Sequence, residues 1–260
     1  MRANSAKARW KAGEVTVGGW LSIPSPFVAE VMAHQGFDWI TVDMQHGLID
    51  YQVAVTMLQA ISTTETIPFV RVPWNEFGII GKMLDAGAYG IIIPMVNSVE
   101  EAKNAVAACR YFPEGSRSFG PIRAGYYGGP DYFTHANREI AVIPMIETQR
   151  ALDSLDDILA VPGIDAVYVG PADLSITLGQ QPGMNNDGAF EAARIKIAKT
   201  CKRHGVTAGI HANAGLTAKH AAAGYQMITI SGDVGAIAAA AGKDLQLARE
   251  SAPKGQPLYQ

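Results

Sequence analysis

The chain has few of the residues and runs that mark several large protein classes. It contains 2 cysteines in 260 residues, Cys109 and Cys201, far apart in the sequence. This argues against a disulfide framework, and we expect two free core thiols in a cytoplasmic protein. Apolar runs such as Gly90–Pro94 are too short to cross a membrane. The start, Met1–Trp10, is basic but lacks the continuous apolar stretch of a secretory signal.

The chain also lacks a large excess of positive or negative charge. The net charge is −3 and no long basic run occurs, which argues against a nucleic-acid partner. Apolar residues are plentiful: 48% of the chain is hydrophobic and 17% is charged, enough to bury a sizeable core. The length is close to the ~250 residues of a typical (β/α)₈ barrel, although length alone does not decide the fold. With no linker or low-complexity tract in the sequence, we expect one domain spanning 1–260.

Short runs rich in β-branched residues alternate with longer stretches of helical period. Several of these runs are apolar on both faces, as parallel strands covered by helices require. The predicted strands are Val17–Leu21, Trp39–Asp43, Ile67–Arg71, Gly90–Pro94, Ala141–Glu147, Ala166–Gly170, Val206–Ile210 and Gln226–Ser231. Before four of them stand glycines that we expect to end a helix, namely Gly36, Gly87, Gly205 and Gly224.

The helical stretches carry apolar stripes that we expect to face the sheet. One stripe consists of Ala54, Met57, Leu58 and Ile61, and the next of Phe77, Ile80 and Leu84. Alternating strands and helices predict a parallel sheet closed into a (β/α)₈ TIM barrel, preceded by a short N-terminal helix. The alternative is an open doubly wound sheet, but no Gly-x-Gly-x-x-Gly follows the first strand.

One segment, Phe112–Glu139, is irregular and rich in Gly, Tyr, Arg and Pro. Connections of this length are usually functional, as a lid or an interface. A solvated excursion is the other possibility.

Acidic residues stand just beyond two predicted strands. Glu147 ends Ala141–Glu147, and Asp173 follows the strand that ends at Gly170. In a barrel, the carboxyl ends of the strands form the rim on which active sites lie. Two anionic oxygen ligands suit Mg²⁺, Mn²⁺ or another divalent ion. The alternatives are structural: Glu147 interacting with a helix dipole, and Asp173 capping a helix that begins near Leu174.

Other polar residues follow strands at the same predicted rim. Asp43 comes three residues before His46, where a carboxylate can orient an imidazole and raise its basicity for general-base catalysis. The alternative is that His46 is a loop histidine without a functional role. Arg71 ends a buried strand and needs an anion, which a developing enolate, a substrate carboxylate or a salt bridge to Asp43 or Glu147 would supply. His211, at the end of the seventh strand, could line the same pocket.

Five motifs together resemble those of the HpcH/HpaI family, the class II metal-dependent pyruvate aldolases related to the citrate lyase β subunit. The resemblance implies a (β/α)₈ barrel that cleaves 4-hydroxy-2-oxo acids reversibly into pyruvate and an aldehyde, using a divalent cation such as Mg²⁺, Mn²⁺ or Co²⁺. In order along essentially the whole chain, the motifs are Val42-Asp43-Met44-Gln45-His46-Gly47, Val70-Arg71-Val72-Pro73-Trp74, Leu84-Asp85-Ala86-Gly87-Ala88, Ile146-Glu147-Thr148 and Gly170-Pro171-Ala172-Asp173-Leu174-Ser175.

The resemblance implies a role for each of these residues. Glu147 and Asp173 would be the metal ligands, and His46 the acid/base residue with Asp43 as its paired carboxylate. Arg71 would bind the keto oxygen of pyruvate. The substrate carboxylate would bind at the helix start formed by Gly170, Pro171, Ala172 and Asp173.

Other implied features concern the aldehyde and the assembly. Leu216, near the exit of the seventh strand, and Phe112–Glu139 are expected to influence which aldehyde binds. Asp85 would lie near a neighbouring subunit's site. The resemblance also implies a hexamer in which the last helix, Asp233–Glu250, is exchanged between subunits.

Two departures from the family pattern leave the substrate and the preferred metal open. Gln45 replaces a glutamate found in many members, and Met145 replaces a glutamine found in some. The first removes a carboxylate near the metal, and the second removes an amide that would hold a polar substrate.

Rival functions share the same scaffold. Oxaloacetate decarboxylation and citryl-type lyase chemistry would also use a metal-stabilised enolate, although no basic cluster clearly suits coenzyme A. A non-catalytic carboxylate-binding barrel is a more remote alternative. No predicted strand ends in lysine, which argues against an aldolase that works through a Schiff base.

Overall fold

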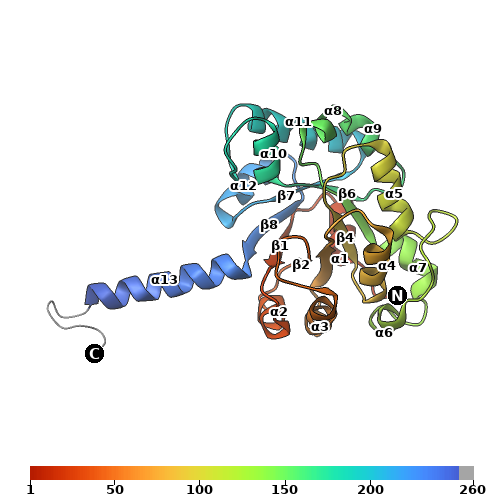
Figure 1. The fold of residues 1–260 in the computed structure, drawn as a ribbon, viewed down its shortest axis with the longest axis horizontal. Helices are drawn as coiled ribbons and strands as arrows, with labels where there is room; N and C mark the ends of the chain where they lie inside the picture. Colours follow the sequence, from red (N-terminus) through yellow and green to blue (C-terminus); the bar gives the residue numbers. More distant parts are fainter. Residues whose placement is uncertain (252–260) are drawn as a thin grey trace.

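Figure 1 shows the computed structural model, which describes residues 1–251 as a ring of strands surrounded by helices. The sheet has eight strands in the order β5-β4-β3-β2-β1-β8-β7-β6, and each paired neighbour is parallel. A bridge between Met145 and Tyr168 joins its two outer strands, and the amide of Ile146 donates to the carbonyl of Tyr168 at 2.9 Å. The sheet therefore forms a nearly closed barrel, which confirms the predicted (β/α)₈ fold.

All eight predicted strands are present, although the fifth ends at Pro144 rather than at Glu147. Met145, the next residue, makes only the isolated bridge. The strands are β1 Thr16–Leu21, β2 Trp39–Asp43, β3 Ile67–Arg71, β4 Gly90–Ile93, β5 Ala141–Pro144, β6 Ala166–Val169, β7 Thr207–His211 and β8 Met227–Gly232.

The helices include the predicted short one at the N-terminus. They are α1 Ser5–Lys11, α2 Pro26–Ala33, α3 Tyr51–Ile61, α4 Phe77–Asp85, α5 Val99–Cys109, α6 Ile122–Gly128, α7 Tyr132–Glu139, α8 Gln149–Asp153, α9 Leu155–Leu159, α10 Pro171–Thr177, α11 Ala189–His204, α12 Thr217–Ala222 and α13 Asp233–Ser251, with a 3-10 turn η1 at Ala214–Leu216. Of the helices in 1–251, none is both long and apolar enough to span a bilayer.

The core lies inside the barrel and between the sheet and its helices. Every residue of β2, β4, β5 and β6 is buried, as strands enclosed on both faces should be. The predicted stripe of α3 is buried in full. On α4 the prediction was wrong for Phe77, which is 46% exposed because it begins the helix at the open rim; Ile80, Met83 and Leu84 make the contact instead.

The expected helix ends and thiols are confirmed. All four predicted helix-ending glycines have positive φ, and at Gly205 the backbone amide bonds the carbonyls of Cys201 and Lys202 at the end of α11. Cys109 and Cys201 are free and buried. Burial raises the pKa of both thiols to about 12, so they are unreactive core residues.

The segment Phe112–Glu139 is less irregular than predicted, because it contains α6 and α7. It connects the end of α5 to the start of β5 and therefore lies at the amino end of the barrel, close to the N-terminus (Figure 1). Arg123 of α6 donates to the carbonyls of Leu58 and Ala86, at the ends of α3 and α4. A lid over the carboxyl rim of its own chain is therefore the wrong interpretation.

The last helix, α13, leaves the barrel as a rod (Figure 1). Asp233 is its buried residue, and both of its carboxylate oxygens accept the backbone amide of Ser22. Four large apolar side chains further along are 47–60% exposed: Val234, Ile237, Leu245 and Leu247. The helix is therefore anchored at its start and lacks cover within the described part of its own chain.

Candidate active site

Parallel strands bring their carboxyl ends to one rim, where four of the predicted site residues meet. Asp43 and Arg71 end the neighbouring strands β2 and β3 and are hydrogen-bonded to each other. Glu147 follows β5, and its pKa is affected by the charges of both Asp173 and Arg71. The barrel thus places three carboxylates and a guanidinium at one rim.

The carboxylate of Asp43 is buried and binds Arg71 in a bidentate pair. Nε donates to Oδ1 at 2.8 Å and Nη2 donates to Oδ2 at 2.6 Å, while the indole N–H of Trp20 donates to Oδ2 at 3.1 Å. Burial raises the pKa of Asp43, but the hydrogen bonds and charge of Arg71 outweigh it, and the pKa lies below its usual value. Of the alternatives open for Arg71, the salt bridge to Asp43 is the one found.

The predicted contact between Asp43 and the imidazole of His46 was wrong. Oδ1 of Asp43 instead accepts the backbone amides of Gln45 at 3.0 Å and His46 at 3.3 Å. Because Arg71 and Trp20 occupy the rest of the carboxylate, Asp43 supports the loop that carries His46 through its backbone. His46 itself is exposed at the rim.

Arg71 is held on two sides and keeps one donor group available. Its guanidinium carbon lies 4.9 Å from the centroid of the Trp20 ring, a cation–π contact that adds to the bidentate pair. Nε and Nη2 both bond Asp43, while Nη1 donates to no acceptor within residues 1–251. A planar cation fixed in this way can present the Nη1 donors to a substrate oxygen.

Glu147 is a buried carboxylate with little support. It is 2% exposed, and the amide of Met95, which donates to Oε1 at 2.8 Å, makes its one hydrogen bond among the described residues. Burial raises its pKa to about 7; the amide of Met95 and the charge of Arg71 oppose the rise, and the charge of Asp173 adds to it. The helix-cap role belongs to the next residue, Thr148, whose side chain accepts the amide of Ala151.

Asp173 is exposed in the first turn of α10. The alternative that it caps a helix starting near Leu174 was wrong, since α10 begins at Pro171 and Gly170 occupies the cap position. A Cβ at Gly170 would lie 2.5 Å from Oε2 of Glu147, so a side chain at this position would displace that carboxylate oxygen. The end of β6 therefore lies directly against Glu147.

The two carboxylates fit a divalent cation. No group of three His, Cys, Asp or Glu side chains gathers as a metal cluster in the described part of the chain, and Glu147 and Asp173 stay the predicted ligands. Oxygen ligands with positions left for water and substrate are typical of Mg²⁺ and Mn²⁺. A cation would also offset the burial and repulsion that raise the pKa of Glu147. Oε1 of Gln45 is a further buried oxygen that has no hydrogen-bond partner among residues 1–251.

Several residues beside the site were missed or only noted from the sequence. Trp20 stacks on Tyr168 with ring centroids 5.6 Å apart, and His211 meets Trp20 edge-on at 4.9 Å. The hydroxyl of Tyr168 lies 3.3 Å from Nδ1 of His211. Burial lowers the pKa of His211 to about 4, and Arg71 acts in the same direction, so the ring is neutral at pH 7. Strand alternation near the rim was the available signal for Trp20 and Tyr168.

The predicted residues Leu216 and Asp85 lie at opposite ends of the barrel. Leu216 ends η1, directly after β7, and packs partly buried at the carboxyl rim. Asp85 is the last residue of α4, so it lies at the amino end, where its carboxylate accepts from Nη2 of Arg117 at 2.8 Å. Burial raises its pKa. Asp85 is therefore outside the site of its own chain.

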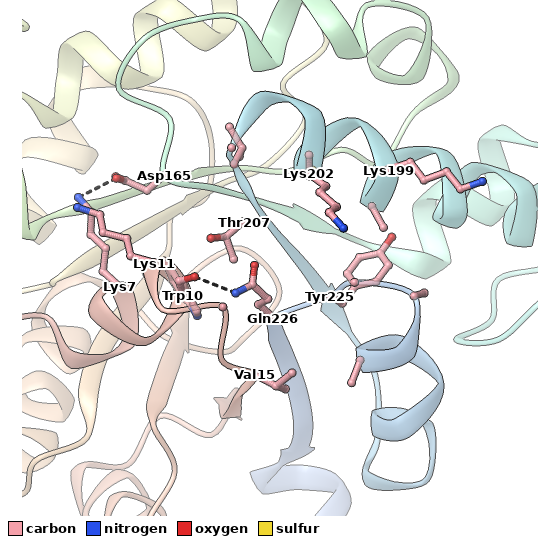
Figure 2. Close-up of a pocket in the computed structure, with 18 of the residues that line it drawn as sticks. Lys7, Trp10, Lys11, Val15, Asp165, Lys199, Lys202, Thr207, Tyr225 and Gln226 are labelled. Carbon is pink, nitrogen blue, oxygen red and sulfur yellow. Dashed lines mark hydrogen bonds and ion pairs between the residues drawn. The ribbon is translucent and has the colours of Figure 1, made fainter.

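A cavity of about 860 Å³ lies at this amino end (Figure 2). Its lining includes Lys7 of α1, Lys202 of α11, and Thr207 and Gln226 where β7 and β8 begin. Lys7 is paired with Asp165. The predicted site residues Asp43, Glu147 and Asp173 lie at the other end of the barrel, so this cavity is separate from the candidate active site.

Several known proteins similar to this chain are named aldolases. The model of the HpcH/HpaI aldolase/citrate lyase family matches residues 16–240. The chain is 38% identical to a hydroxypyruvate/pyruvate aldolase of Rhizorhabdus wittichii over 92% of its length and 96% of the relative's. It is 37% identical to a 5-keto-4-deoxy-D-glucarate aldolase of an Enterobacter species, over 92% of this chain and 94% of the relative.

A solved structure agrees with these relatives. A family protein from Burkholderia cenocepacia superposes with a TM-score of 0.89 at 35% identity, covering 95% of this chain and all of the other. The family model covers most of the sequence, and the fold of this solved family member agrees with it. The chain therefore belongs to the HpcH/HpaI aldolase/citrate lyase family.

Proposed function

We propose that the protein is a cytoplasmic, divalent-metal-dependent aldolase. It would cleave 4-hydroxy-2-oxo acids reversibly into pyruvate, or a close 2-oxo acid, and an aldehyde. The observation that carries the proposal is the pair Glu147 and Asp173 beside a fixed Arg71 at the carboxyl rim. Relatives at 37–38% identity that are named aldolases support it.

Binding of the 2-oxo acid follows from the donors and acceptors at the rim. Glu147 and Asp173 would hold the cation, which supplies polarisation of the keto oxygen when bound. Arg71 directs its Nη1 donors at the oxygen on which negative charge develops, and Asp43 and Trp20 keep it in place. The amides of Ala172 and Asp173, in the first turn of α10, receive the substrate carboxylate.

Bond cleavage requires a base at the 4-hydroxyl group. His46 removes that proton, the C4–O bond becomes a carbonyl, and the C3–C4 bond breaks. Its electron pair passes to the 2-oxo acid fragment, which becomes an enolate next to Arg71. The aldehyde leaves, and protonation of C3 yields pyruvate, so the proton lost from the hydroxyl is balanced by the one gained at carbon.

We also propose that residues 1–260 form one catalytic domain that assembles into a hexamer with α13 exchanged between subunits. The exposed Val234, Ile237, Leu245 and Leu247 support this, since apolar residues on a projecting helix need cover. Asp85, at the amino end, would then serve a neighbouring subunit's site. Light scattering should give an oligomer, and Ile237→Asp should shift it toward smaller species.

Metal dependence and product identity test the activity together. Purified protein is stripped with EDTA, and Mg²⁺, Mn²⁺ or Co²⁺ is added back in the presence of a 4-hydroxy-2-oxo acid, with pyruvate and aldehyde read by chromatography. We expect both products only with metal. Turnover that survives chelation would contradict the proposal, and release of CO₂ from oxaloacetate without aldol cleavage would favour a decarboxylase. No product from either substrate would indicate a binding protein.

A screen in the synthetic direction addresses the specificity. Pyruvate and hydroxypyruvate are each combined with a panel of aldehydes, both aromatic and acidic. The preferred pair identifies the acceptor that the rim near Leu216 accommodates.

A further inference from the structure

The turn between β4 and α5 has an unusual backbone conformation at Met95. Its φ is 55°, and it is the one non-glycine residue with positive φ in the described part of the chain. Residues other than glycine rarely adopt this left-handed backbone conformation, which persists where surrounding contacts hold it. The conformation has a consequence at the rim, because the amide of Met95 donates to Oε1 of Glu147 at 2.8 Å.

Asn97 supplies the contacts that hold this turn. Its Nδ2 donates to the carbonyl of Met95 at 2.8 Å, and its Oδ1 accepts the hydroxyl of Thr148. The backbone amide of Asn97 donates to Oε2 of Glu101 at 2.5 Å. Since the Met95 carbonyl can only accept, the Asn97 amide group has one orientation that satisfies both of its side-chain contacts.

These contacts form a closed ring across two strand ends. From Glu147 the ring runs through the amide and carbonyl of Met95 to the side chain of Asn97, then to Thr148, the neighbour of Glu147. The turn after β4 and the turn after β5 are therefore held together around the carboxylate. Its other described surroundings include Gly170, which offers no side chain to direct it.

We propose that Asn97 is a positioning residue for the metal ligand Glu147. It acts through Met95, by holding the turn in the left-handed conformation that aims the amide at the carboxylate. The inference rests on the proposed metal site and extends it to a residue that touches neither the cation nor the substrate. Without Asn97 the Met95 amide turns away, and Glu147 loses its orientation.

The test measures Mn²⁺ affinity directly, by electron paramagnetic resonance of free Mn²⁺ in the absence of substrate. We expect Asn97→Ala to weaken Mn²⁺ binding roughly 10–100-fold, the usual effect of removing a residue that orients a metal ligand. Asn97→Asp keeps the shape and the acceptor but loses the amide donor. Its added negative charge would by itself favour a cation, so a loss of affinity would come from the missing donor.

A rescue separates positioning from general stability. Glycine adopts the left-handed conformation without a side-chain cost, so Met95→Gly in the Asn97→Ala background should recover part of the Mn²⁺ affinity. The control is Asn137→Ala: Asn137 is also half-buried and bonds the backbone of Tyr111, but it lies at the amino end. It should leave Mn²⁺ binding unchanged.

The outcomes are distinct. Wild-type affinity in both Asn97 variants overturns the role of Asn97, and so does an equal loss in Asn137→Ala. If Asn97→Ala does not fold, Asn97→Asp decides. Wild-type protein that binds no Mn²⁺, or Glu147→Gln protein that binds it as wild type does, overturns the metal site itself. Loss of binding in Glu147→Gln with none in the Asn97 variants overturns only the positioning role.

Discussion

Each end of the barrel contains a carboxylate with little exposure to solvent, 17% for the side chain of Asp165 and 2% for Glu147, but the two are supported very differently. At the amino end, Asp165 binds the ammonium of Lys7 at 2.7 Å and the guanidinium of Arg110 at 2.7 Å, and accepts the amide of Val142 at 3.0 Å. At the carboxyl end, Glu147 accepts one amide within residues 1–251 and lies near the like charge of Asp173. One end compensates its charge internally, and the other leaves it to be compensated by a ligand.

This difference in support indicates that the amino end of the barrel serves stability and the carboxyl end serves function. A buried charge without sufficient partners costs folding free energy. A barrel retains such a charge at its carboxyl rim, where ligands bind, and pairs its charges at the other end. Asp43 is intermediate: it is fully bonded, but its bonds position Arg71 and the loop of His46. Substitutions at the carboxyl end should therefore reduce activity more than stability, and substitutions at the amino end should reduce stability more than activity.

The largest effect on activity is expected for Glu147→Gln. Retro-aldol turnover should fall about 10³-fold or more, because a bound cation contributes several kcal/mol to transition-state stabilisation. The free energy of unfolding of the metal-free protein should not fall, since the amide removes a poorly supported charge and can still accept from Met95. Steady-state kinetics and urea unfolding measure the two. A lower free energy of unfolding in this variant would contradict the view that the charge of Glu147 is poorly supported in the fold.

His46→Ala should lower retro-aldol turnover roughly 10²–10⁴-fold, the usual contribution of a general base. Exchange of the pyruvate methyl protons in D₂O should be less affected, because it does not involve the 4-hydroxyl. The control is His204→Ala at the amino end, where His204 contacts Asp156 at 2.9 Å. Undiminished cleavage by His46→Ala would remove His46 from the mechanism.

Asp165→Asn should show the reverse pattern. It leaves Lys7 and Arg110 buried without their anion, which typically costs about 3–5 kcal/mol of stability. For a chain of this size the melting temperature should drop by roughly 10 °C. Turnover measured well below the melting temperature should remain near that of the wild type. A large loss of turnover in folded protein would show that the two ends are not independent.

The smallest expected effect is a pH dependence of stability in the metal-free protein. The pKa of Glu147 is about 7 in the folded chain against an ordinary 4.5. Between these values the folded state binds more protons than the unfolded state, so the free energy of unfolding falls as pH rises through this window. The fall should be on the order of 1–3 kcal/mol.

Urea unfolding at pH 5 and pH 8 in EDTA measures this change. Glu147→Gln should lack this part of the pH dependence, and Mn²⁺ should stabilise the wild type at pH 8. Identical pH profiles for the wild type and the variant would mean that Glu147 titrates normally. Ionisation of Glu147 would then not lower the free energy of unfolding.

Much of the fold was predictable because its signals are local. β-Branched runs, helical apolar stripes and the helix-ending glycines locate the strands and helices from neighbouring residues alone, and all eight strands were found. The rim position of Asp43, Arg71, Glu147 and Asp173 follows from where each strand ends. The exceptions were also local: Phe77 lies on the apolar stripe, but at the exposed first turn of its helix.

The order of strand–helix units, and the side chains that leave the strands at the carboxyl rim, can thus be inferred from the amino-acid sequence, because periodicity and strand ends are properties of consecutive residues. Which groups touch depends on the folded structure. It paired Asp43 with Arg71 rather than with the ring of His46, placed Asp85 at the opposite end and aimed the amide of Met95 at Glu147. These contacts join residues that are distant along the chain, and closure of the barrel brings them together.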